Sequence, residues 1–339
     1  MSIPLSVLDL APISRGQTPG ESIAASVALA QRAEQSGYRR VWYAEHHNMP
    51  TIASSATSVL IAVVGAQTSS IRLGAGGVML PNHSPLTIAE QFGTLDAAYP
   101  GRIDLGLGRA PGSDQNTMYA LRRDPRSADR FPQDVLELQG YLAGETRVPG
   151  VDAVPGKGTN VPLYILGSSM FGATLAAALG LPYAFASHFA PAMLEPAVQA
   201  YRREFKPSAQ LDRPYVIAGV NAVAADSREA AESAYAAVRR TLAVGLFGRG
   251  RQLSDDEAQL LLDGGAGLHV DTMLTHTAVG TPPMVREFLD GFAEHADADE
   301  LIVAHQSPLV ADRLRSVELT ADAMAGAVSA SAAGAASQR

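Results

Sequence analysis

The chain has 339 residues and a formal net charge of −8, from 26 Lys and Arg against 34 Asp and Glu. This acidic balance argues against binding to nucleic-acid phosphates, which normally requires a basic face. The sequence contains no cysteine, and this excludes disulfides, thiolate metal sites, iron–sulfur clusters and a cysteine nucleophile.

The N-terminal residues and the hydropathy pattern predict a cytoplasmic protein. The first residues, MSIPLSVLDLAP, have no basic segment and reach an acid at Asp9, unlike a secretory signal peptide. The longest apolar stretches, 58–66 and 173–186, are too short or too interrupted to span a membrane. We therefore expect no membrane and no nucleic-acid partner.

Short apolar segments alternate with longer, alanine-rich helical segments along most of the chain. The predicted strands are residues 4–10, 40–47, 71–80, 102–110, 162–169, 182–189, 214–225 and 300–306. The predicted helices are near residues 21–37, 55–68, 85–98, 128–143, 172–180, 192–205, 228–245, 282–295 and 309–325. This alternation indicates βαβ units, and nearly continuous apolar strands indicate a parallel sheet covered on both faces. Eight strands favour a closed (β/α)₈ TIM barrel over an open doubly wound sheet.

Two segments depart from this alternation within a predicted single domain of residues 1–325. Residues 246–278 are too long for a simple connection and predict an insertion before the last βα unit. Inserted loops on the catalytic face of such a barrel often act as lids. Residues 326–339 are of low complexity, and we expect this tail to be disordered.

The active site of such a barrel is built where the strands end, which directs attention to the residues after the second strand. Glu45, His46 and His47 follow one another there, and in an extended strand His46 points away from the other two. Histidine is suited to move a proton near neutral pH, so one of the two histidines is a candidate general base. A hydrogen-bonded polar cluster stays equally open on these residues alone, and a metal site is the third alternative.

Glycines mark the third strand. Gly76 and Gly77 stand in the run GAGGVMLP, and glycines within a strand usually mark a bulge or the close approach of a ligand or of another backbone. These two residues are candidates for contact with a flat ring, and a packing role is the alternative.

An arginine and a serine-rich turn are candidates for a phosphate site. Arg109 ends the fourth strand, where its planar guanidinium suits a phosphate or a carboxylate, with a structural salt bridge as the alternative. Ser168, Ser169 and Gly172 join the fifth strand to a helix, and free amides at a helix N-terminus bind anions. A simple helix cap is the alternative there.

Three motifs together resemble the luciferase-like, flavin-dependent monooxygenases. They are AEHH in the second strand, GGVMLPNHSPLTIAEQFGTLD at the third and YPGRIDLGLGRAPGSD at the fourth, and the similarity continues through LYILGSS and GLPYAFASHF and returns at VGTPPMVREFL and ELIVAH. The resemblance covers most of the chain except the insertion and the tail. It is specific for the superfamily and not for a substrate.

The resemblance implies a TIM barrel that binds reduced FMN, which reacts with O₂ to give a C4a-peroxide that oxidises a small organic substrate. It places the catalytic histidine at His46, the phosphate-contacting arginine at Arg109 and the phosphate loop at Ser168, Ser169 and Gly172. It also implies a non-prolyl cis peptide at Gly76–Gly77 or its immediate neighbour, beneath the flavin ring. A separate flavin reductase and a homodimer formed through the second and third helices are the implied partners.

Some residues depart from the luciferase pattern. Gly108 stands where light-emitting chains have a reactive cysteine, and Ser168 stands where they have an acidic residue. Light emission is therefore not expected, and the substrate stays open, with long-chain aldehydes included. Two alternatives keep the barrel: an F420-dependent hydride-transfer oxidoreductase and a non-catalytic flavin-binding relative. A metal-dependent hydrolase is disfavoured, because it needs further ligands at other strand ends, and only His83, His188 and His305 are available there.

Overall fold

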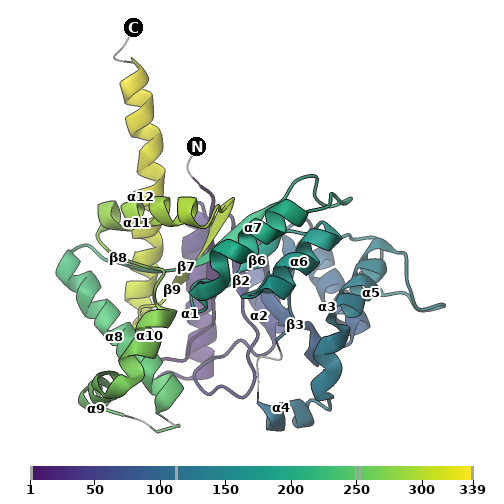
Figure 1. Ribbon diagram of the computed structural model, residues 1–339, viewed down its shortest axis with the longest axis horizontal. Coiled ribbons are helices and arrows are strands. Elements are labelled where there is room, and N and C mark those ends of the chain that lie inside the picture. The colour runs from purple at the N-terminus through teal and green to yellow at the C-terminus, as the bar shows by residue number, and fades with distance from the viewer. Residues whose placement is uncertain (1–2, 111–113, 249, 252, 337–339) are drawn as a thin grey trace.

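Eight parallel strands pair in a closed ring in the structure, a computed structural model that describes residues 3–110, 114–248, 250–251 and 253–336 (Figure 1). The order is β6–β5–β4–β3–β2–β1–β9–β7, and β6 pairs with β7 to close the ring. The strands are β1 (Leu5–Asp9), β2 (Arg40–Tyr43), β3 (Arg72–Met79), β4 (Ile103–Gly108), β5 (Leu163–Gly167), β6 (Tyr183–Phe185), β7 (Val216–Ala224) and β9 (Glu300–His305). The predicted TIM barrel is confirmed, and each predicted strand has a counterpart in the ring.

Helices surround the barrel and bury the main hydrophobic core between themselves and the strands (Figure 1). They are α1 (Pro19–Gln35), α2 (Thr57–Gly65), α3 (Pro85–Ala98), α4 (Gln115–Ala120), α5 (Phe131–Ala143), α6 (Met170–Leu179), α7 (Leu194–Glu204), α8 (Arg228–Phe247), α11 (Pro282–His295) and α12 (Val310–Ala336). In the described part of the chain, no helix is both long and apolar enough to cross a membrane.

The insertion lies between α8 and the last βα unit, as predicted. It contains α9 (Asp255–Leu261), a π-helical segment (Leu262–Ala266) and α10 (Gly267–Met273), and its residues 249 and 252 lie outside the described part. A ninth strand, β8 (Thr277–Gly280), then pairs with the C-terminal half of β7 outside the ring. Strand β8 was not predicted, because a four-residue strand ending in glycine gives little periodic signal.

The last helix continues through much of the tail where we expect disorder. Helix α12 runs to Ala336 and projects from the body of the protein in Figure 1, and residues 337–339 lie outside the described part. Alanine has the highest intrinsic helix propensity, so an alanine-rich segment that follows a packed helix extends it readily.

A network of charged side chains fills the end of the barrel at which the strands begin. Arg40 of β2 is 1% exposed, and its guanidinium donates to Asp104 of β4 at 2.8 Å and to Glu300 of β9 at 3.2 Å. The same group donates to the Tyr164 hydroxyl of β5 at 2.7 Å. Arg72 of β3 pairs with the other oxygen of Asp104 at 2.5 Å. Both carboxylates are therefore paired, as buried charges require.

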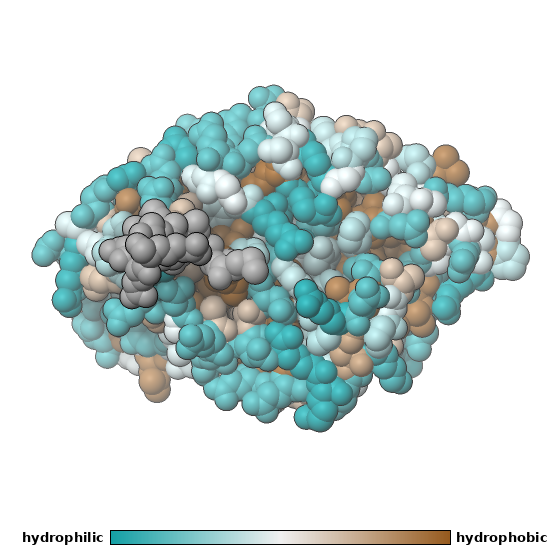
Figure 2. Space-filling model, turned by 90° about the horizontal axis from the view of Figure 1, so that it is seen from above, coloured by the Kyte–Doolittle hydropathy of each residue, from teal (hydrophilic) through white to brown (hydrophobic). Residues whose placement is uncertain are grey.

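The outer surface at this end of the molecule is mainly hydrophilic. Figure 2 views the molecule from above Figure 1, on the side where the chain enters β1, and hydrophobic residues appear there only in small separate areas. The charged network closes the barrel beneath this face. A ligand site is therefore expected at the opposite end, where the strands finish.

The first prediction concerns this network. Arg40→Met should destabilise the protein by about 3–5 kcal/mol, because two buried carboxylates lose their shared cation. Urea denaturation measures the change. Arg39→Met is the matched control, since this arginine lies 3.5 Å from the same Glu300 but has a side chain that is 46% exposed. Its loss should cost less than about 1 kcal/mol, and equal costs for the two variants would contradict a special role for Arg40.

Candidate functional site

Strand β2 divides its side chains between the barrel interior and the outer layer. Trp42 and Ala44 belong to the interior cluster, whose members are Leu8, Trp42, Ala44, Tyr164, Ala184, Ile217, Ile302 and Ala304. Continued alternation directs His46 toward the interior as well, and Glu45 and His47 away from it. An electrostatic effect of His46 on His188, which follows β6 on the other side of the ring, is in keeping with this direction.

His46 is half-buried at this mouth. Burial lowers the pKa of its imidazole, Glu45 acts to raise it and His47 lowers it further, with a net lowering from the ordinary value. The imidazole is therefore held neutral near pH 7, which leaves one ring nitrogen able to accept a proton and the other able to donate one.

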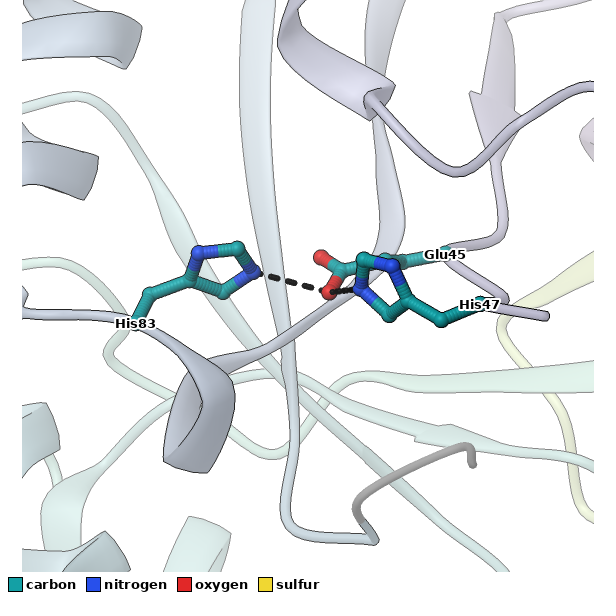
Figure 3. Close-up of side chains that lie close together, drawn as sticks. All are labelled: Glu45, His47 and His83. Carbon is teal, nitrogen blue, oxygen red and sulfur yellow. Dashed lines mark hydrogen bonds and ion pairs between the residues drawn. The ribbon is translucent and has the colours of Figure 1, made fainter. Parts of the chain in front are cut away.

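Glu45 binds two histidines with one of its carboxylate oxygens (Figure 3). The Nε2 atoms of His47 and His83 each lie 2.8 Å from Glu45 Oε1, and the Met79 N–H donates to Oε2 at 3.2 Å. Burial raises the pKa of Glu45, but the hydrogen bonds from the two histidines outweigh it and hold the pKa at about 2. The carboxylate is therefore ionised. His83 follows β3 and its short 3₁₀ helix (Leu80–Asn82).

The glycines of β3 form a bulge next to β4. Ala75 pairs with Leu105 and Val78 with Leu107, so β3 carries one extra residue between the two pairs. The Gly76–Gly77 peptide is cis, where the resemblance implies one. A β-carbon on Gly77 would lie 2.8 Å from the carbonyl oxygen of Gly106. The expected bulge and close backbone approach are both present, and packing is one reason for these glycines.

Arg109 meets the N-terminus of α6 at the rim of the barrel. Its guanidinium carbon lies 4.2 Å from the centre of the Phe171 ring, in the first turn of α6. Arg109 forms no ion pair with the carboxylates that the structure describes, so the alternative of a structural salt bridge is not found there. Residues 111–113 of the following loop lie outside the described part.

The serine turn leaves the first amides of α6 without side-chain caps. Ser169 is the N-cap residue of α6, and its hydroxyl makes no capping hydrogen bond. Ser168 is half-buried and Ser169 exposed, whereas Gly172 is buried. A β-carbon on Gly172 would lie 3.2 Å from the ring of Tyr183. The structure thus brings Arg109, Ser168 and Ser169 to one rim, and the glycine has a packing reason of its own.

Hydrogen bonds link His188, Asn221 and Gln306 at the mouth, and the sequence predicted only part of this group. Asn221 of β7 is fully buried, donates to the His188 carbonyl at 2.6 Å and accepts from the Gln306 side chain at 2.9 Å. His188 Nδ1 is buried without a hydrogen-bond partner among the described residues. Burial, with a smaller effect of His46, lowers the His188 pKa to about 4, so its imidazole is neutral. A lone asparagine inside an apolar strand gave no periodic signal for this contact.

Solvent reaches the barrel interior only part of the way down from this mouth. Leu10 and Leu166, which pack on the interior cluster, are half-buried, as are Gly76 and Ala186. Deeper interior residues such as Trp42 and Ile217 are fully buried. The half-buried layer is made of glycine, alanine and leucine, and the layer above it holds His46 and His188. An apolar floor under convergent polar groups is typical of small-molecule sites.

Comparison with known proteins identifies the family. The model of the luciferase-like monooxygenase family matches residues 3–298, and the chain belongs to this family. A luciferase-like monooxygenase of Escherichia coli (strain K12) is 48% identical over 324 residues, which cover 95% of this chain and 97% of that protein. The crystal structure of apo-MsnO8 is 37% identical, covers 95% of this chain and 98% of its own, and has a TM-score of 0.88.

Two more distant structures share the fold alone. An F420-dependent secondary alcohol dehydrogenase in complex with an F420–acetone adduct has a TM-score of 0.71 at 17% identity, over 95% of this chain and 98% of its own. The oxygenating constituent of 3,6-diketocamphane monooxygenase from Pseudomonas putida, in complex with FMN, has a TM-score of 0.70 at 16% identity, over 95% and 97%. The family makes this protein an oxidoreductase of the monooxygenase type.

The second prediction tests the packing of the site floor. Gly106→Ala should destabilise the protein by about 1–3 kcal/mol, because its β-carbon would lie 2.3 Å from the Ala75 carbonyl oxygen. Gly108→Ala, two residues along the same strand, is the control, since the nearest atom to its β-carbon is Met79 Sδ at 3.6 Å. Chemical denaturation compares the two. A Gly106 variant as stable as the Gly108 variant would show that β3 and β4 are not tightly fixed here.

Proposed function

We propose that this monooxygenase uses reduced FMN and O₂ to oxidise a small organic substrate, with aldehydes among the candidates. The observation that carries the proposal is the meeting of Arg109 with the first turn of α6, at a ring distance of 4.2 Å to Phe171. Uncapped helix amides next to an arginine that forms no ion pair with the described carboxylates suit a dianionic phosphate. FMN carries such a phosphate on a chain that lets its flat ring lie deeper in the barrel.

The residues of the mouth fit the remainder of FMN. Arg109, Ser168, Ser169 and the Gly172 amide would hold the phosphate, and the ring would lie over Gly76–Gly77, where no side chain projects. When bound, reduced FMN supplies two electrons to O₂, through the C4a-peroxide that the family resemblance implies. The apolar floor limits the water that competes with the organic substrate.

His46 is the proposed proton-handling group. It is half-buried at the mouth and directed toward the interior, as strand alternation requires. From there it would hold or move a proton at flavin N5 or at the oxygen that leaves as water. The insertion of α9 and α10 is proposed to close over the mouth and exclude solvent.

The proposed assembly follows the resemblance as well. A separate flavin reductase would supply the reduced FMN, and the protein is proposed to act in the cytoplasm as a homodimer through α2 and α3. Val59 and Val63, one turn apart on α2, are 62% and 42% exposed and give that helix an apolar outer face. Such a face is suited to burial against a second copy.

The experiment that tests the cofactor is anaerobic titration of the purified protein with reduced FMN and with reduced F420, followed by air. We expect reduced FMN to bind and to react with O₂. Preferential binding of F420 would instead indicate hydride transfer on the same barrel. Binding of reduced FMN without any oxygenated product from an aldehyde and thioether panel would favour a non-catalytic flavin-binding relative.

The third prediction places the phosphate. Arg109→Ala should weaken reduced FMN by about 1.5–3 kcal/mol, the worth of a charge-assisted hydrogen bond, or roughly 10- to 100-fold in Kd. Arg126→Ala is the control, because Arg126 lies in the 3₁₀ helix Pro125–Arg130 and its side chain is 83% exposed. If both variants bind reduced FMN with the wild-type constant, the phosphate lies elsewhere.

The fourth prediction concerns His46. His46→Ala should bind reduced FMN with little change but release more hydrogen peroxide per flavin oxidised, because the proton-handling group is gone. Oxygen uptake and peroxide are measured together after air is admitted. His295→Ala, at the end of α11 with a side chain that is 44% exposed, should keep the wild-type ratio. An unchanged ratio in His46→Ala would remove this residue from the mechanism.

A further inference from the structure

We propose that Glu45, His47 and His83 form a binding site for a divalent transition-metal ion of the Zn²⁺ type, separate from the flavin site. One ligand atom from each residue lies within 4.8 Å of the others (Figure 3). Among the described residues this is the only group of three or more histidine or carboxylate side chains that converges in this way. The proposal goes beyond the flavin chemistry and does not depend on it.

The chemistry of the three ligands matches a known class of site. Two imidazole nitrogens and one carboxylate oxygen bind zinc in hydrolytic enzymes and iron in oxygenases. Around a metal with bonds of about 2.1 Å, neighbouring ligand atoms stand about 3.0–3.4 Å apart. Glu45 Oε1 lies 2.8 Å from each Nε2 atom, and the ligand atoms all lie within 4.8 Å of one another, so a metal requires the two imidazoles to move away from Oε1 and toward each other. Each Nε2 must also release its proton, as metal binding generally requires.

The surroundings of Glu45 favour a cation. The Glu45 side chain is 2% exposed, and within the described chain no lysine or arginine pairs with it. Its second oxygen accepts from the Met79 N–H at 3.2 Å, which fixes the orientation of the carboxylate. A buried carboxylate that only histidines neutralise gains more from a divalent ion than one paired with arginine, such as Asp104.

The site is also open to solvent on the histidine side. The His47 and His83 side chains are 17% and 26% exposed, which leaves room for water to complete the coordination. His83 lines a surface cavity of about 240 Å³ together with Ser84 and Arg123. This cavity gives an ion a route to His83 from outside the barrel and not through the mouth where His46 lies.

A bound ion would brace the loop that carries His46. Glu45 and His47 flank His46 in sequence, and His83 belongs to the segment after β3. Coordination by all three would tie the ends of β2 and β3 together on the outer side of the barrel. The ion therefore acts on the position of His46 and takes no part in electron transfer.

The fifth prediction is tested on the flavin-free protein after treatment with EDTA. Titration with Co²⁺, followed by visible absorbance, and with Zn²⁺, followed by calorimetry, should each reveal one saturable site. His83→Ala and Glu45→Gln should weaken Co²⁺ binding by about 100-fold or more, since loss of a ligand costs at least as much as loss of a group that orients one. Circular dichroism checks that both variants are folded.

The matched control is His295→Ala. His295 Nδ1 also faces a glutamate, Glu195, at 3.1 Å, but without a third ligand, so its removal should leave Co²⁺ binding unchanged. Wild-type crystals soaked in Zn²⁺ should show anomalous density between the three side chains, a result that needs no variant. Absence of saturable binding, wild-type affinity in His83→Ala or density elsewhere would each overturn the proposal. Because no flavin is present, failure of the proposed monooxygenase mechanism would not affect these outcomes.

Discussion

The ion pairs of Arg40 at the closed end of the barrel are the constraint on which the open end depends. One guanidinium joins Asp104 of β4 to Glu300 of β9, two strands that are not neighbours in the ring. Ser6 of β1 donates to the same Glu300 at 2.5 Å. These hydrogen bonds join β2, β4, β9 and β1, and their strict geometry helps to set the register of these strands. The opposite end can then be lined by small side chains, which could not fix that register by packing alone.

The alternation along β2 produces every layer of the barrel in turn. Arg40 lies at the end of the barrel where the strands begin, and Trp42 fills the middle of the interior. Beyond β2, the small side chain of Ala44 packs on the interior cluster, and His46 lies at the mouth. On neighbouring β3 the glycines continue the small layer, because β-carbons on Gly74 or Gly76 would lie within 3.0 Å of Trp42 atoms. The Trp42 indole therefore leaves no room for a side chain at Gly74 or Gly76. Without side chains at these two positions, the layer above Trp42 consists of small residues.

Much of this arrangement could be predicted from the sequence, and the remainder depended on contacts between distant segments. Continuous apolar runs predicted all eight strands of the ring, since strands buried on both faces have that pattern. The expected directions of Glu45 and His46 came from the predicted strand 40–47, whereas β2 ends at Tyr43 and both residues follow it. The pairing of Glu45 with His83 was not predicted, because it depends on where the chain turns after the bulge in β3. The contact of Asn221 with His188 and the strand β8 were not predicted for a similar reason. Both depend on pairing between segments that are distant in the sequence.

Neighbouring residues after β2 lie on opposite sides of the barrel wall and differ in charge. His46 lies inside, near His188 and an apolar floor, where water is restricted and a neutral imidazole is maintained by burial. Glu45 and His47 lie outside, where an ionised carboxylate persists because histidines donate to it. Glu45 still acts on His46 through the barrel wall, since it opposes the lowering of the His46 pKa by burial. Strand geometry keeps them on opposite sides of the barrel wall while the backbone between them transmits any change in position. The hydrogen bonds of Glu45 therefore hold the chain next to His46 from outside the barrel.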